Sequence, residues 1–179
     1  DAERIMEIIR QAQAQMRALG SRQWQDGYPA RADIDRDIAR GYGYVFEKSD
    51  AAENPAAAET PQKYDKGTVP GGVIAYGAVV FDGEPAYGAI DGAWLTGGDY
   101  VVLHRLAVAD GEKGRGVAAE FMRRTEALAR GRGVGSFRVD TNFDNRYMLR
   151  MLERLRFAYC GKIIYESGER LAFEKPFEA

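Results

Sequence analysis

The chain has few of the residues from which proteins build disulfides and transition-metal sites. Among its 179 residues there is one cysteine, Cys160, and one histidine, His104. A single cysteine excludes an internal disulfide and a zinc site built from several cysteines. We therefore expect no protein-built metal centre.

Excess charge and long apolar runs are also scarce. The formal net charge is -2, so we expect no general affinity for nucleic acid or for a membrane surface. The longest apolar runs are too short to span a bilayer, and the first residues have no basic-then-apolar signal pattern. These absences predict a soluble, cytoplasmic protein.

The length fits a single domain, residues 1–179, with helices and strands interspersed. The predicted helices cover residues 2–19, 33–40, 118–130 and 145–155, and the predicted strands cover residues 42–48, 72–81, 100–108, 137–141, 159–165 and 170–174. This order predicts an α/β (α+β) fold with a central sheet. Residues 49–70 show no strong periodicity, which is typical of a long connection, and residues 83–99 suggest a loop or short helix.

A strand, a glycine turn and a helix follow one another near the middle of the chain. Gly114 and Gly116 lack Cβ atoms, so an anion can approach the backbone, and Lys113 and Arg115 add positive charge. The first N–H groups of the following helix have no partner inside it and carry the positive end of its dipole. The turn could therefore hold a pyrophosphate, although neither common glycine-rich phosphate motif is present.

Three segments in order resemble the GCN5-related N-acetyltransferase (GNAT) superfamily. The turn reads Lys113-x-x-Gly116-x-Ala118 after a strand that contains Leu-Ala-Val, similar to the family's Arg/Gln-x-x-Gly-x-Gly/Ala. The strand 137–141, Asn145 and the helix end Leu-Glu-Arg-Leu-Arg-Phe (152–157) follow at the family's spacing. The resemblance implies a GNAT-like domain with a mixed, splayed sheet flanked by helices. It also implies a strand before the first helix, which we expect to be missing from this chain.

The resemblance further implies an acetyl-CoA-dependent N-acetyltransferase without a metal. Its acceptor would be a primary amine (a small amine, an amino acid or a peptide amino terminus) that attacks the thioester directly in a ternary complex. The resemblance also implies that the protein could form a homodimer. The family's contacts can be carried over by position. Coenzyme A would then contact the backbone of Leu106, Ala107 and Val108, and its pyrophosphate would bind the turn formed by Lys113, Gly114, Arg115, Gly116, Val117 and Ala118. Asn145 would lie near the pantetheine arm.

The residues that move protons depart from the family pattern. Val102 stands where a carboxylate base is common, and alternation along a strand predicts that His104 shares a face with Val102 and Leu106. His104 is therefore our candidate base, with Asp140 as a rival and a purely structural histidine as the alternative. Leu152 replaces the tyrosine that often protonates the thiolate. Tyr147 and Tyr159 are the candidate substitutes, and protonation by solvent is the alternative, since a thiolate is a tolerable leaving group.

Aromatic residues in two loops are candidate acceptor contacts: Trp24, Tyr28, Tyr87 and Trp94. The alternative for each is packing against the core. Arg123 or Arg124 could bind a coenzyme A phosphate with Lys113, or simply be solvated.

Two other functions remain open at this stage. Because the usual base and acid are missing, the domain could bind acyl-CoA as a sensor without turnover. The glycine turn could also belong to a nucleotide-binding protein.

Overall fold

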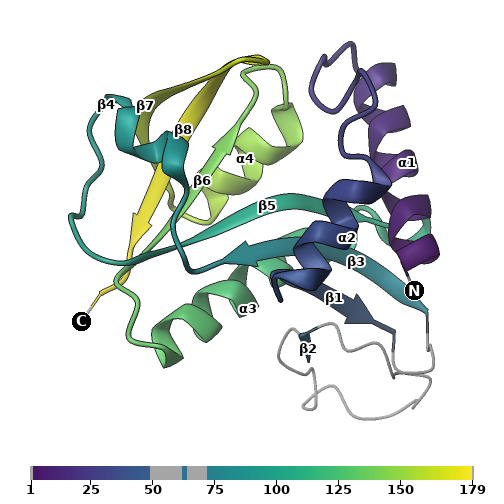
Figure 1. Cartoon of the computed structure of the whole chain (residues 1–179), viewed down its shortest axis with the longest axis horizontal. Helices are drawn as coiled ribbons and strands as arrows, with labels where there is room; N and C mark the ends of the chain where they lie inside the picture. Colours follow the sequence, from purple (N-terminus) through teal and green to yellow (C-terminus); the bar gives the residue numbers. More distant parts are fainter. Residues whose placement is uncertain (1, 49–61, 64–71, 179) are drawn as a thin grey trace.

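The chain folds around one mixed β-sheet (Figure 1). The computed structural model describes residues 2–48, 62–63 and 72–178, and within them the sheet has eight strands in the order β2-β1-β3-β5-β6-β8-β7-β4. The strands are β1 (Gly43–Glu47), β2 (Gln62–Lys63), β3 (Val73–Val80), β4 (Asp91–Gly92), β5 (Tyr100–Val108), β6 (Ser136–Thr141), β7 (Ala158–Tyr165) and β8 (Gly168–Pro176). The α-helices are α1 (Ala2–Ala18), α2 (Arg31–Ala39), α3 (Val117–Gly131) and α4 (Arg146–Arg154), and the short 3-10 helices are η2 (Pro85–Ala89) and η3 (Asp110–Glu112).

The predicted fold class is confirmed, and the predicted elements agree with the structure to within a few residues at their ends. Of the connection expected over residues 49–70, only residues 62 and 63 are described, and they form β2, which the sequence did not predict. The strand expected before the first helix is not among the described residues.

Helices cover both faces of the sheet. Apolar residues of α1 and α2 pack on one face, with Ile5, Ile9 and Ile34 fully buried against β3. Residues of α3 and α4 share a second cluster on the other face, in which Phe121 and Leu152 are fully buried. A smaller third cluster lies under η2.

The sheet opens between its two central strands. β5 and β6 run parallel, and their paired residues are Tyr100–Ser136, Val101–Phe137 and Val102–Arg138. Beyond Val102 the strands separate, and Figure 1 shows β6 leaving β5 at a wide angle. The splayed sheet implied by the resemblance is therefore present, and the later half of β5 is not paired with β6.

Arg105 interrupts the regular pleat of β5. Its φ is 55°, and the register against β3 shifts at the same point: Ala78 pairs with His104, whereas Tyr76 pairs with Ala107. Two residues of β5 therefore lie opposite one residue of β3, which defines a β-bulge.

The bulge changes which side chains share a face. Val102 packs under η2 beside Tyr87, whereas Leu106 packs with Leu103 in the cluster below α3. The prediction that His104 shares a face with both Val102 and Leu106 is wrong for Leu106, because alternation is broken between them.

Candidate active site

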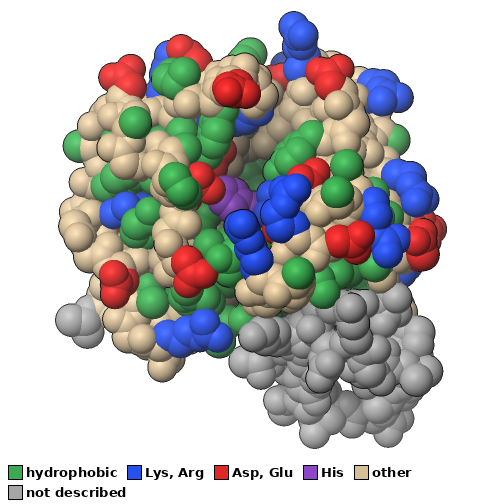
Figure 2. Space-filling view, in the orientation of Figure 1, with side chains coloured by type: hydrophobic (Ala, Val, Ile, Leu, Met, Phe, Trp, Pro, Cys, Tyr) green, Lys and Arg blue, Asp and Glu red, His purple; other side chains and the backbone are tan. Residues whose placement is uncertain are grey.

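A cleft of about 960 Å³ lies between α2, the α1–α2 loop and the ends of β5 and β6. Figure 2 shows this hollow near the centre of one face, with the single histidine at its bottom, acidic side chains on one side and Lys or Arg side chains on the other. Leu103 and Leu106 of β5 and Val139 of β6 also line it. The cleft therefore reaches the gap where the two central strands separate.

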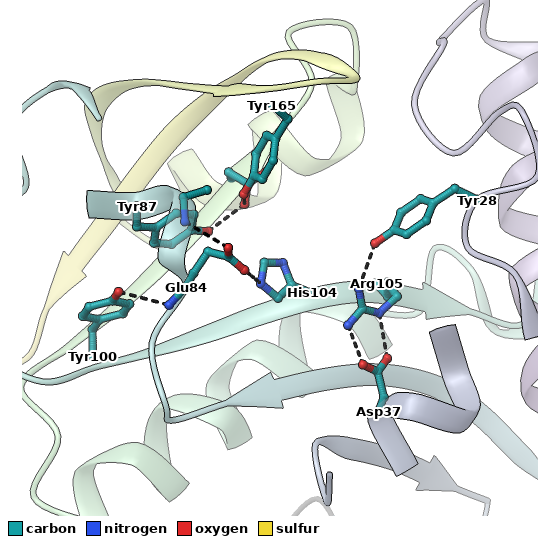
Figure 3. Close-up of polar contacts among 10 residues, drawn as sticks. Tyr28, Asp37, Glu84, Tyr87, Tyr100, His104, Arg105 and Tyr165 are labelled. Carbon is teal, nitrogen blue, oxygen red and sulfur yellow. Dashed lines mark hydrogen bonds and ion pairs between the residues drawn. The ribbon is translucent and has the colours of Figure 1, made fainter. Parts of the chain in front are cut away.

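His104 and Glu84 form a pair inside the cleft (Figure 3). The Nε2 of His104 lies 3.1 Å from the Oε2 of Glu84, and the two side chains are 19% and 23% exposed. The hydrogen bond from His104 lowers the pKa of Glu84, which keeps this carboxylate ionised. Since an ionised carboxylate can only accept, Nε2 carries a proton, and in the neutral form of the ring Nδ1 is then the nitrogen with the free lone pair.

Glu84 is held in place by the start of η2. Its carboxylate accepts a hydrogen bond from the N–H of Ala86 at 3.2 Å, and its own N–H donates to the hydroxyl of Tyr100 at 3.2 Å. His104 was predicted from the sequence, but its partner Glu84 was not. Glu84-Pro85 is a typical helix start and was the available signal, but it does not show which strand the cap faces.

Arg105 points into the same cleft as His104, although the two residues are adjacent in β5 (Figure 3). Its guanidinium donates to both carboxylate oxygens of Asp37, at 2.7 and 2.6 Å, and to the hydroxyl of Tyr28 at 2.8 Å. The hydroxyl of Tyr76 also donates to Asp37, at 2.7 Å. The bulge thus places a neutralised cation beside the histidine, and this group was not anticipated from the sequence.

Asp140, the rival base, stands at the end of β6 and also lines the cleft. Its Oδ1 accepts hydrogen bonds from the hydroxyls of Tyr87 at 2.7 Å and Tyr165 at 3.4 Å. Burial raises the pKa of both tyrosines, so both remain protonated donors near neutral pH. One oxygen of Asp140 is therefore already engaged by two phenols.

The four candidate acceptor aromatics separate into two pairs. Trp24 and Tyr28 line the cleft. Tyr87 is 1% exposed, and Trp94 donates its indole N–H to the carbonyl of Tyr87 at 2.9 Å. Neither residue lines the cleft. Trp94 also stacks against the guanidinium of Arg138. Tyr87 and Trp94 therefore fit the alternative given above for each aromatic residue, which is packing against the core.

Asn145 lies where the cleft meets α4. Its Oδ1 accepts from the N–H of Met148 at 3.2 Å and so caps α4. Its Nδ2 donates to the Oε1 of Gln23 at 3.0 Å. The α1–α2 loop therefore contacts the same turn that the resemblance assigns to the donor.

The glycine turn before α3 has the geometry of an anion cradle. Gly114 and Gly116 have φ values of 77° and 82°, and a Cβ added at either would meet no atom within 4 Å. Among the described residues, none accepts a hydrogen bond from the N–H groups of residues 117–119. Free amides at the start of a helix, reached through open space, can hold a phosphate group.

The cations of this turn have acidic neighbours. Lys113 contacts Asp110 at 2.5 Å and Arg115 contacts Glu112 at 3.2 Å. The Arg115 side chain is 64% exposed and the Lys113 side chain is 24% exposed, so the contact of Arg115 in particular can exchange for a bound anion at modest cost. Of the three β5 residues assigned to coenzyme A, Leu106 lines the cleft, whereas Ala107 and Val108 do not.

The described residues contain no group of three or more His, Cys, Asp or Glu side chains that could hold a metal ion. Within the same residues, no helix combines the length and the apolar character needed to cross a membrane.

Proteins of known structure share the fold of this chain. The sequence profile described as "Acetyltransferase (GNAT) family" matches residues 31–157. A solved GNAT-family acetyltransferase from Streptococcus agalactiae 2603 is 34% identical, with a TM-score of 0.79 over 99% of this chain and 91% of its own. The chain belongs to the GNAT acetyltransferase family.

More distant GNAT structures share the fold. An acetyltransferase from Listeria monocytogenes 4b F2365 is 18% identical, with a TM-score of 0.68 over 99% of this chain and 90% of its own. The NatC complex bound to Gag peptide and CoA is 13% identical, with a TM-score of 0.57 over 83% of this chain and 80% of that chain. No curated protein matches this GNAT chain at a significant level.

Two positions of this GNAT chain cannot carry the usual proton transfers. Val102 and Leu152 are both fully buried in apolar clusters. The substitutes considered for Leu152, Tyr147 and Tyr159, are more than half exposed and do not line the cleft.

Proposed function

We propose that this GNAT protein transfers an acetyl group from acetyl-CoA directly to a primary amine, with donor and acceptor bound together. The observation that carries this proposal is the His104–Glu84 pair in a cleft that also opens between β5 and β6. In this arrangement the acceptor enters from the α1–α2 side and the thioester from the strand gap.

The glycine turn and the splayed strands support the donor half of the site. The pyrophosphate binds the free N–H groups at the start of α3, where Gly114 and Gly116 leave room. Lys113 and Arg115 supply charge, and the pantetheine arm passes between the splayed strands toward Asn145. This assignment agrees with the presence of CoA in the distantly similar NatC complex.

His104 supplies the proton acceptor. Its Nδ1 takes a proton from the acceptor ammonium, directly or through a water molecule, and Glu84 holds the ring and stabilises the imidazolium that forms. The neutral amine then attacks the thioester carbonyl carbon, and the nitrogen of the tetrahedral intermediate loses its surplus proton to solvent. The C–S bond breaks, and the departing thiolate takes a proton from solvent. The absence of a tyrosine at position 152 is tolerable because a thiolate is a good leaving group.

A backbone group can stabilise the oxyanion of this reaction. The N–H of Ala109 donates to the carbonyl of Ile74 toward β3, at 2.8 Å. Successive N–H groups of a strand alternate in direction, so the N–H of Val108 points toward β6. A donor in that gap is suited to the developing negative charge.

Acceptor specificity depends on the α1–α2 side of the cleft. Trp24 and Tyr28 line that side, beside the Arg105–Asp37 pair. The surroundings are polar and mixed in charge, which suits a small amine, an amino acid or a peptide amino terminus.

The decisive experiment mixes the protein with acetyl-CoA and a panel of amines, amino acids and short peptides, and follows free thiol. We expect thiol release that depends on both the acceptor and His104. Calorimetric binding of acetyl-CoA without thiol release for any acceptor would favour an acyl-CoA sensor. ATP binding as tight as that of coenzyme A would favour a nucleotide-binding protein instead.

A further inference from the structure

The cleft contains a side-chain amide that the fold leaves without a partner. Asn142 is 7% exposed, and its Oδ1 is the one buried side-chain polar atom without a hydrogen bond among the described residues. Buried polar groups are nearly always paired, so an unpaired one calls for an explanation. Asn142 lines the cleft, so a turn of its amide would bring this inaccessible oxygen to a ligand and give it a partner.

The position of Asn142 indicates which ligand it meets. It follows directly after β6, and its backbone carbonyl accepts from the N–H of Asn145 at 3.1 Å. Val139 and Met148 line the cleft on the same β6–α4 wall. This wall faces the strand gap, whereas the His104–Glu84 and Arg105–Asp37 pairs involve η2, β5 and α2.

The chemistry of the side chain indicates which group it meets. A carboxamide has one acceptor oxygen and one donor nitrogen, and rotation about Cβ–Cγ exchanges their positions. Its natural complement is a second amide, which offers one N–H and one C=O. A fully ionised phosphate only accepts, and an ammonium group only donates.

We propose that the side chain of Asn142 binds an amide of the pantetheine arm, and so contributes to donor affinity without taking part in the chemistry. This inference rests on the proposed use of a coenzyme A thioester. A peptide acceptor also carries amides, so the experiment must separate the two sources.

The experiment compares wild type with Asn142→Leu, which is close in volume and has no polar atoms. Calorimetry is done with coenzyme A and with adenosine 3′,5′-bisphosphate, which lacks the pantetheine arm. We expect the dissociation constant for coenzyme A to rise about tenfold and that for the bisphosphate to stay within about twofold. Without ligand, we expect the Leu variant to melt no lower than wild type, because an unpaired polar group has been removed.

Several results would overturn the inference. An unchanged coenzyme A dissociation constant would do so, and so would equal losses for coenzyme A and the bisphosphate. A rise confined to the KM of a peptide acceptor would assign Asn142 to the acceptor instead. If Leu does not fold, Asn142→Ala adds no bulk and allows the same comparison. If wild-type protein does not bind coenzyme A at all, the proposed function is refuted. This outcome differs from a failure of the Asn142 inference alone, in which wild type still binds coenzyme A.

Discussion

Asp37 on α2 and Arg105 at the bulge of β5 form a two-point ion pair across one wall of the cleft, with N–O distances of 2.7 and 2.6 Å. Asp37 is 4% exposed, and Tyr76 donates a third hydrogen bond to it. The pair joins a helix to the interrupted strand, so it fixes the geometry of the cleft wall.

Breaking this pair should be costly. We expect Asp37→Asn to lower the free energy of unfolding by about 3 kcal/mol, because it leaves the largely buried Arg105 cation without its counterion. Urea unfolding at pH 7 measures the change. Asp35→Asn is a matched control on the same helix, since Asp35 pairs with Arg31 at 2.9 Å with both side chains about half exposed, and we expect a change of about 0.5 kcal/mol or less. Equal effects of the two substitutions would contradict the structural role of Asp37.

The His104–Glu84 pair should control the rate of acetyl transfer. We expect His104→Gln to lower kcat by about 100-fold, the effect typical of a lost general base, and to remove the acid limb of the pH–rate profile. Glu84→Gln keeps the imidazole but loses the charge that orients it, so we expect a smaller decrease of about tenfold. Steady-state kinetics over a pH series measures both effects. A pH–rate profile unchanged by His104→Gln would exclude His104 as the base.

The same pair should make stability depend on pH. His104 lowers the pKa of folded Glu84 below its ordinary value of 4.5, so the ionised carboxylate stabilises the fold above that pH. As pH falls through the lowered pKa, this contribution is lost. We expect wild type to exceed Glu84→Gln in unfolding free energy by about 1 kcal/mol at pH 7, with the difference shrinking below about pH 4.5. Urea titrations of both proteins at several pH values test this, and a difference that grew on acidification would have the wrong sign.

The glycine turn should be required for donor binding. We expect Gly116→Ala to raise the dissociation constant for coenzyme A about tenfold. No protein atom lies within 4 Å of the added Cβ, but residue 116 has a left-handed backbone that alanine adopts at a cost. Gly131→Ala is the control at the other end of α3, where the added methyl also meets no atom. Calorimetry should show that the control binds coenzyme A with unchanged affinity. An equal loss of affinity in both variants would contradict the claim that the turn is required for donor binding.

Arg156 offers a stabilising substitution. It follows α4 with a φ of 64°, a conformation that favours glycine, and its N–H donates to the carbonyl of Glu153. We expect Arg156→Gly to raise the free energy of unfolding by about 1 kcal/mol, seen as a melting temperature about 2–4 °C higher. Arg156→Ala removes the same side chain but keeps the strain, so an equal gain in that variant would assign the effect to charge.

Local patterns in the sequence were enough to predict most of the fold. Apolar spacing located the α-helices and most strands, and the glycines at 114 and 116 marked the start of α3 because turn chemistry is local. The splay of the sheet came from the family resemblance. The short strands β2 and β4 were missed, since two residues carry no periodicity.

The arrangement of the cleft was harder to predict because it depends on contacts between distant residues. Glu84 and His104 are 20 residues apart and Asp37 and Arg105 are 68 apart, so no spacing rule connects them. The bulge was also invisible, because arginine at a positive φ has no sequence signature. The role of Tyr87 was also not predictable from the sequence, since an aromatic residue in a loop can pack against the core or contact a ligand equally well.

The extra residue in β5 makes the site depend on chain length as well as on side-chain identity. Deleting Arg105 would remove the extra residue and restore regular alternation along the strand. Leu106 would still share a side with Leu103, and His104 would still face Glu84, but the cation that binds Asp37 would be gone. A strand without the extra residue could therefore present only one of two adjacent side chains to the cleft, so the histidine and the arginine reach the same side only because the strand is one residue longer there.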